Sequence, residues 1–179
     1  MAGSETLGFK VKSVSHFLKH LKELGERLLP VFKKKVRYEM NQFVAAAIVS
    51  HKEIENEDIS IIYEANRKLD VACENLSDIV QDSCFSFNRL VVLMNTTKPA
   101  RHGEARLFDP DVKIRKEILG IRAIGLMDDN NTNFLDNLKS MFANDFKTKR
   151  LPYIMCIFSH NIPCTEQSHQ CAKIIDEFA

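Results

Sequence analysis

The sequence has no tryptophan and only 6 glycines and 5 prolines among its 179 residues. Sandwiches and barrels built from many short strands need more turn-forming residues than this, so the composition favours a helix-rich chain. Basic and acidic side chains nearly balance, at a formal net charge of +1, which argues against a dedicated polyanion-binding protein. No run of about 18 apolar residues occurs, so we expect no membrane-spanning helix and no membrane partner.

Signals for secretion and for two common enzyme classes are also missing. Residues 1–10 contain no apolar segment of the kind found in secretory signals. The 5 cysteines are an odd number spread along the chain, which does not indicate a disulfide framework. We therefore expect an intracellular protein, cytoplasmic or nuclear, with thiols free for metal binding or catalysis. The sequence has neither a glycine-rich phosphate-binding loop nor a Gly-x-Ser-x-Gly nucleophile motif.

The balanced total conceals blocks of opposite charge. Residues 1–38 hold nine basic and three acidic side chains, residues 39–84 hold three and ten, and residues 85–127 hold eight and four. Blocks of this size predict helix surfaces that pair within the fold or that steer a partner. The cluster Lys33–Arg37 is also a candidate nuclear-import or nucleic-acid-binding patch.

Apolar residues at i, i+3, i+4 and i+7 predict three helices in the first half of the chain. The first covers Val14–Leu28 and is ended or kinked by Pro30. The second covers Val36–Ile48, although Phe43–Val49 also fits a buried strand. The third covers Ile59–Val80. We find no motif for chemistry in these helices.

The second half of the chain differs in character. The segments Phe85–Asn95 and Pro152–Ser159 are rich in aromatic and branched residues, and each predicts a strand. His102–Phe108 follows the first of them and is able to open a helix. We therefore divide the chain into a helical region at residues 1–84, acting as a lid or an interaction layer, and an α/β region at residues 85–179. The alternative is a single compact domain.

Two short motifs follow these predicted strands in a meaningful order. A His-x-Glu motif at His102 and Glu104 follows the first strand, and a Pro-Cys pair ending at Cys164 follows the second, with Cys171 shortly beyond. This arrangement resembles the cytidine deaminase-like superfamily of zinc enzymes, whose signature is His-x-Glu followed by Pro-Cys-x-x-Cys. The resemblance implies that His102, Cys164 and Cys171 bind Zn²⁺ and that Glu104 shuttles protons without binding the metal.

The chemistry of such a site explains the residue types. One neutral imidazole and two thiolates hold zinc and leave the fourth position for water, whose pKa the metal lowers. A neighbouring carboxylate passes the protons of that water, one to the ring nitrogen and one to the leaving amine. The resemblance thus implies hydrolytic deamination of a cytosine- or adenine-type base, as a nucleobase, a nucleoside or part of a single-stranded nucleic acid. A protein partner or a homo-oligomer is also compatible with the sequence.

The sequence departs from the superfamily signature in two ways. The two cysteines are spaced Cys-x6-Cys, and on a continuous helix such residues lie about 10 Å apart, too far for two ligands of one zinc ion. If both bind, residues 165–170 leave the helix, and His169 in this segment is the alternative third ligand to Cys171. The superfamily sheet has further strands after the Pro-Cys helix, whereas this chain stops at Ala179, so we expect its C-terminal strands to be missing.

The expected fold is therefore α+β or α/β, with a helical N-terminal region packed against a deaminase-like α/β/α core. Two other features have structural interpretations. Cys156 lies in the middle of the second predicted strand and is expected in the hydrophobic core. His51 and Glu53 form a second His-x-Glu match, which we interpret as a solvated helix end. The competing hypothesis for the whole chain is a non-catalytic helical interaction protein in which the zinc motif is vestigial or coincidental.

Overall fold

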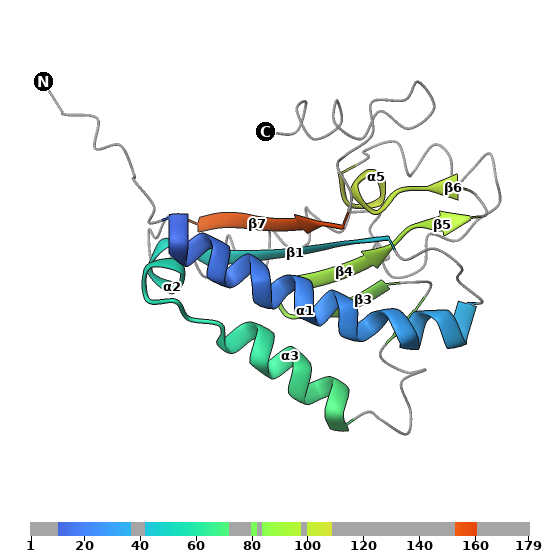
Figure 1. The fold of residues 1–179 in the computed structure, drawn as a ribbon, viewed down its shortest axis with the longest axis horizontal. Coiled ribbons are helices and arrows are strands. Elements are labelled where there is room, and N and C mark those ends of the chain that lie inside the picture. The colour runs from blue at the N-terminus through green and yellow to red at the C-terminus, as the bar shows by residue number, and fades with distance from the viewer. Residues whose placement is uncertain are drawn as a thin grey trace, which may run out of the picture.

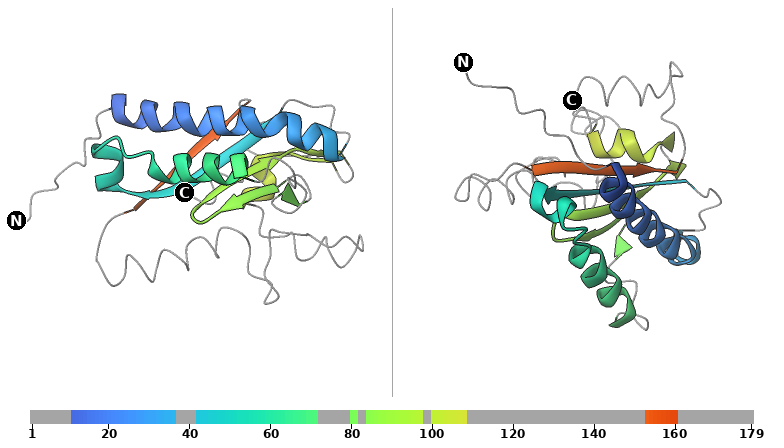
Figure 2. Two further views of the ribbon diagram at one scale, coloured as in Figure 1. Left: turned by 90° about the horizontal axis from the view of Figure 1, so that it is seen from below. Right: turned by 60° about the vertical axis from the view of Figure 1, so that its left-hand side comes forward.

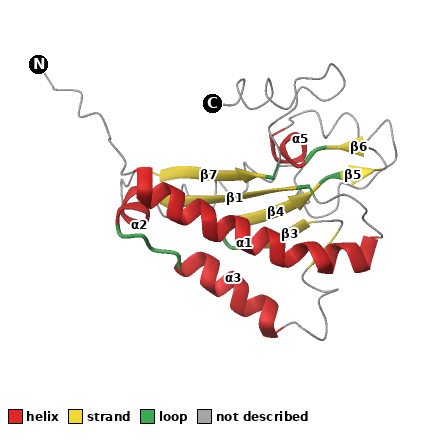
Figure 3. Ribbon diagram, viewed as in Figure 1, coloured by secondary structure: helices red, strands yellow, loops and turns green. Residues whose placement is uncertain are grey.

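The structure is a computed structural model, and it describes residues 11–36, 42–71, 80–81, 84–97, 100–108 and 153–160 (Figure 1). The elements, in chain order, are α1 (Val11–Val36), β1 (Phe43–Ser50), α2 (His51–Glu55), α3 (Ser60–Val71), β2 (Val80–Gln81), β3 (Cys84–Phe87), β4 (Leu90–Met94), β5 (Thr96–Thr97), β6 (Ala100–Arg101), α5 (Gly103–Phe108) and β7 (Tyr153–Ser159). Helices and antiparallel strands together form a mixed α+β fold (Figure 3). None of the helices in the described part of the chain has the length and apolar character needed to cross a lipid bilayer.

The main sheet has the strand order β2-β3-β4-β1-β7, and every pairing in it is antiparallel. Because β4 and β7 are both antiparallel to β1, they run in the same direction on either side of it (Figure 1). Met94 at the end of β4 pairs with Phe43, and Ser159 at the end of β7 pairs with Val44. The ends of β4 and β7 therefore flank the start of β1, at the same end of the sheet.

The two faces of the sheet are covered by different helices. A Cβ built at Gly25 of α1 would lie 2.0 Å from the Phe43 ring, and one built at Gly103 of α5 would lie 2.8 Å from Cγ1 of Val44. Successive side chains of a strand point to opposite faces, so α1 and α5 lie on opposite faces of β1. Figure 2 shows α5 across the strands from α1 and α3.

Helix α1 covers its face of the sheet with a continuous apolar stripe. The fully buried side chains of this stripe are Phe17, Leu21, Leu24, Leu28 and Phe32. The helix predicted over Val14–Leu28 is confirmed, but the prediction that Pro30 ends it is wrong, because α1 continues to Val36. Pro30 itself is exposed, whereas Phe32 is buried one turn beyond Leu28, so packing of the stripe outweighs the backbone hydrogen bond that proline removes.

The second predicted helix is wrong from Phe43 onward, and the alternative of a buried strand at Phe43–Val49 is confirmed by β1. All eight residues of β1 are buried because β4 and β7 flank it and both of its faces are covered. A strand that is buried on both faces has a continuous apolar sequence, and periodicity alone does not separate it from a buried helix. The region expected to be helical at residues 1–84 thus contributes the strand that joins β4 to β7.

Two further elements are shorter than the sequence predicts. The single strand expected over Phe85–Asn95 is a hairpin, because β3 and β4 are separated by a turn in which Asn88 has a φ of 47°. Asparagine tolerates this left-handed conformation better than most residues. The third helix is confirmed over Ser60–Val71, whereas Val80, expected at its end, lies in β2.

Candidate functional site

The helix that carries the first predicted motif is fixed to the sheet by a buried asparagine. Asn95 directly follows β4 and is 4% exposed. Its Oδ1 accepts a hydrogen bond of 2.8 Å from the backbone N–H of Gly103, the first residue of α5. Its backbone N–H and its Nδ2 donate to the backbone oxygen and to Oε1 of Gln42, just before β1. The start of α5 is therefore tied to the end of β4 and the start of β1.

Gly103 allows α5 to lie directly on two strands. A Cβ at this position would lie 2.8 Å from Cγ1 of Val44, 3.1 Å from the backbone nitrogen of Val44 and 3.1 Å from the carbonyl oxygen of Leu93. A side chain of any size would need these atoms to move, and two of them belong to the paired backbone of β1 and β4. His102 and Glu104, on either side of Gly103, are consequently held at the edge where β4 and β7 end.

Glu104 contacts the end of the strand that precedes the second motif. Its side chain is buried, with 6% of its surface exposed, and its Oε1 accepts a hydrogen bond from the hydroxyl of Ser159. Ser159 is the last residue of β7 and lies opposite Val44 in the sheet. Residues 55 positions apart in the sequence are thus brought together.

Arg106 adds a second anchor for α5. Its buried guanidinium donates from Nη1 to the carbonyl oxygen of Met94, the last residue of β4. Its backbone N–H donates to the carbonyl oxygen of His102 at 3.0 Å, which closes the first turn of the helix. The two ends of α5 are therefore attached to the same strand, because Asn95 directly follows Met94.

The next residue after Ser159 lies on the other face of the sheet. The imidazole of His160 packs against the ring of Phe43, with 5.4 Å between the ring centroids, and its backbone N–H donates to the carbonyl oxygen of Phe43 at 3.0 Å. Phe43 faces α1, as its approach to Gly25 shows. His160 is therefore not a partner of Glu104, and Ser159 is the residue of this strand end that faces α5.

The remaining predicted ligands, Cys164, Cys171 and the alternative His169, lie outside the described residues, as does the segment in which C-terminal strands are expected to be missing. His102 is half-buried at the start of α5. Within the described ranges, no group of three or more His, Cys, Asp or Glu side chains could hold a metal ion. The zinc site therefore stays a prediction that combines described and undescribed positions.

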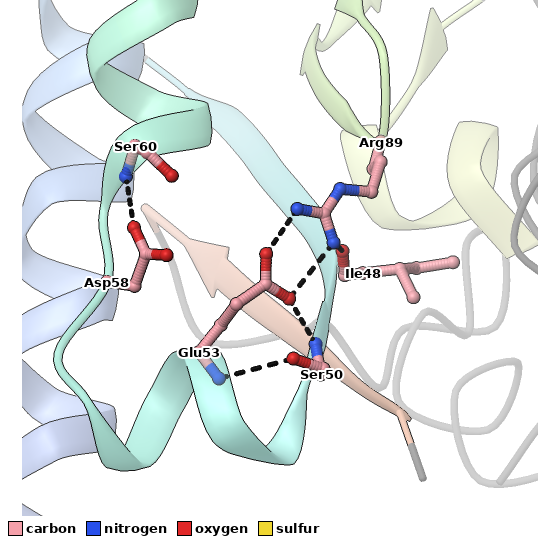
Figure 4. Close-up of polar contacts among 6 residues, drawn as sticks. All are labelled: Ile48, Ser50, Glu53, Asp58, Ser60 and Arg89. Atoms are coloured by element: carbon pink, nitrogen blue, oxygen red, sulfur yellow. Dashed lines mark hydrogen bonds and ion pairs between the residues drawn. The ribbon is translucent and has the colours of Figure 1, made fainter. Parts of the chain in front are cut away.

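The second His-x-Glu match lies at a helix end, as expected, because α2 begins at His51, but the expectation that it is solvated is wrong for Glu53 (Figure 4). Glu53 is only 20% exposed and accepts hydrogen bonds from the backbone N–H of Ser50 at 2.6 Å and from the Arg89 guanidinium. Burial raises the pKa of Glu53, but the hydrogen bonds from Arg89 and Ser50, together with the charge of Arg89, outweigh burial and hold that pKa below its usual value. This carboxylate therefore ties α2 to the β3–β4 turn.

Cys156 is confirmed as a core residue. It is buried in the middle of β7, and burial raises the pKa of its thiol to about 11. Its position three residues before Ser159, inside the strand, is that of a structural cysteine, and buried structural cysteines are chemically inert. This residue is therefore not part of the candidate site.

Two residues of the site were not predicted from the sequence. Asn95 and Ser159 are single polar residues that end apolar strands, and that position is the only signal the sequence carries for them. Their contacts with α5 join residues 8 and 55 positions apart, which no local pattern encodes. The chain matches no known family model, no curated protein and no solved structure.

Proposed function

We propose that the chain is a zinc-dependent, deaminase-like protein that removes an amino group hydrolytically from a cytosine- or adenine-type base, free or in nucleic acid. In this proposal His102, Cys164 and Cys171 bind zinc, and Glu104 is the proton shuttle. The observation that carries the proposal is the hydrogen bond from Ser159 to Glu104. It brings the end of the strand that leads to the Pro-Cys motif against the His-x-Glu motif.

The topology of the sheet supports the same arrangement. β4 and β7 run in the same direction with β1 between them, and the His-x-Glu motif follows one while the Pro-Cys motif follows the other, so both motifs follow strands that end at the same end of the sheet. Cys164 is five positions beyond Ser159, and a segment of this length spans at most about 17 Å, so its thiol is within reach of α5.

The residue types of the proposed site are compatible with bound zinc. Imidazole and thiolate are ligands that zinc prefers, and the set of His102, Cys164 and Cys171 leaves one coordination position open. Glu104 has two carboxylate oxygens with about four acceptor positions, and the Ser159 hydroxyl occupies one of them. The carboxylate therefore retains capacity to accept a hydrogen bond from water.

Zinc would supply the Lewis acid that makes water acidic near neutral pH. Glu104 would take one proton from that water and pass it to the ring nitrogen, and it would then take the second proton from the same oxygen and pass it to the amine, which leaves as ammonia. Its burial restricts competing hydrogen bonds from bulk water, and its position is fixed because Gly103 packs on Val44. The chain itself thus supplies the orientation of the acid–base group.

Metal analysis of the purified full-length protein tests the proposal. We expect about one zinc ion per chain, and we expect Cys164→Ser and His102→Ala each to abolish it. His16→Ala is the matched control, since His16 lies on α1, across β1 from α5, and its loss should leave the zinc content unchanged. A wild-type protein that is metal-free after expression with zinc present would contradict the proposal.

Glu104→Gln separates an active enzyme from a non-catalytic protein. Glutamine keeps an oxygen that accepts from Ser159 but does not take up a proton, so zinc content should stay unchanged while turnover falls by about 10²–10⁴. Ammonia release from cytidine, adenosine and a single-stranded oligonucleotide measures this. Loss of zinc in this variant would make Glu104 a ligand and refute its assigned role. If the zinc-loaded wild type deaminates none of these probes, the alternative of a vestigial zinc site is favoured.

A further inference from the structure

A buried carboxylate needs hydrogen-bond donors in place of the water that it has lost. Glu104 is buried, and the structure gives its Oε1 a donor in the hydroxyl of Ser159. A glutamate side chain has three rotatable bonds, so the same backbone position allows several carboxylate orientations. A single donor placed on a rigid element selects among them.

Ser159 is placed on such an element. Its backbone pairs with Val44 in the sheet, and the next residue extends this contact through the hydrogen bond from His160 to Phe43. Val44, opposite Ser159, is also the residue whose Cγ1 and backbone nitrogen lie against Gly103. Val44 thus positions both the backbone next to Glu104, through Gly103, and the Ser159 hydroxyl that binds the Glu104 carboxylate.

We propose that Ser159 is a positioning residue that fixes the orientation of the Glu104 carboxylate, so that one oxygen is held by the protein and the other is presented to water. This inference rests on the proposed function, because a fixed carboxylate serves catalysis only if Glu104 is the proton shuttle. The Ser159 hydroxyl keeps its proton throughout; it orients Glu104 and takes no part in the proton transfers.

Two variants of nearly equal shape test the hydroxyl alone. Ser159→Thr keeps the donor, whereas Ser159→Val removes it, and both side chains are favoured in strands, so both variants are suited to β7. Ser86→Ala in β3 is the control, since Ser86 is exposed and its strand is separated from β7 by β4 and β1. Circular dichroism and urea unfolding verify that each variant is folded.

The measurement is the rotamer population of Glu104, obtained from three-bond NMR couplings in isotope-labelled full-length protein, with and without added zinc. We expect one dominant rotamer in the wild type, in Ser159→Thr and in Ser86→Ala. In Ser159→Val the population of that rotamer should fall about twofold or more, toward an average over the three staggered positions. Zinc content should be unchanged in all variants, because Ser159 orients Glu104 and not the ligands.

An unchanged Glu104 rotamer in Ser159→Val, or an averaged rotamer already in the wild type, would overturn the assignment of Ser159. Loss of zinc in Ser159→Val alone would also overturn it, because the residue would then support the metal ligands. A wild type that binds no zinc refutes the proposed function instead. The rotamer comparison in zinc-free protein still decides whether Ser159 holds Glu104, so the two failures are distinguishable.

Discussion

Replacing Gly103 by alanine tests the close packing on which the candidate site depends. The added Cβ would lie 2.8 Å from Cγ1 of Val44 and 3.1 Å from both the Val44 nitrogen and the Leu93 oxygen. The Val44 methyl group has some freedom to move. The two backbone atoms have little, because β1 and β4 pair along this stretch. We therefore expect the start of α5 to shift away from the sheet.

The expected cost follows from two opposing effects. Alanine is favoured over glycine in a helix by up to about 1 kcal/mol, and by less at the first residue of a helix such as α5. Forcing an extra methyl group into a well-packed interior costs about 1–3 kcal/mol. The second effect wins, and Gly103→Ala should lower the free energy of unfolding by about 1–2 kcal/mol. For a chain of this size the melting temperature should fall by roughly 2–8 °C.

Urea denaturation of four proteins measures this: the wild type, Gly103→Ala, Val44→Ala and the double variant. Val44→Ala removes Cγ1 and so relieves the shortest contact, while the two backbone contacts remain. Gly103→Ala should therefore cost less in the Val44→Ala background than in the wild type, but still more than zero. If Gly103→Ala is as stable as the wild type, or more stable, the packing argument is refuted.

Three further predictions concern other residues. Arg89→Ala should cost about 1–3 kcal/mol at neutral pH in urea denaturation. The folded-state pKa of Glu53 lies below 4.5, so the wild type has a stability contribution that is present above pH 4.5 and is lost as the pH falls through this folded-state pKa. In Arg89→Ala burial still raises the pKa of Glu53, so this variant should lose less stability on acidification. Iodoacetamide at mildly alkaline pH should label Cys156 only after unfolding, as mass spectrometry would show, since its thiol has a pKa of about 11; labelling of Cys156 in the folded protein would contradict its burial. Cys171→Ser should weaken zinc binding more than His169→Ala in competition with a chelator, and the reverse order would make His169 the third ligand.

Elements with a strong one-sided pattern could be predicted from the sequence. The stripe from Phe17 to Phe32 defines α1 because each of its members is buried on the same face. β7 could be predicted because an apolar, aromatic segment is bounded by Pro152 and His160. The mixed α+β class follows from these two patterns together.

Elements whose pattern is set by tertiary contacts could not be predicted as securely. β1 is apolar from Phe43 to Val49 because both of its faces are covered, so its sequence fits a buried helix equally well. The turn at Asn88 has no glycine or proline to mark it, and its positive φ depends on the pairing of β3 with β4. Both errors come from contacts that form between distant segments.

The charge blocks show the same division between local and distant information. Their opposite signs predict paired surfaces, and Arg27 of α1 does bind Asn66 at 2.9 Å and Asp70 on α3. Which side chains pair depends on how α1 crosses α3, and the counts alone do not encode that. Because these side chains are well exposed, the pair contributes little stability.

The register of β1 decides whether the candidate site forms at all, although β1 supplies no catalytic group. Phe43 faces α1 at Gly25, and Val44 faces α5 at Gly103. A shift of β1 by one residue would exchange its two faces and place the Phe43 ring against the start of α5. Gly103 would then lose the surface on which it packs. Ser159 would no longer pair with Val44 and would lose its position beside Glu104. The contact between Ser159 and Glu104 and the packing of Gly103 therefore depend on the same register of β1.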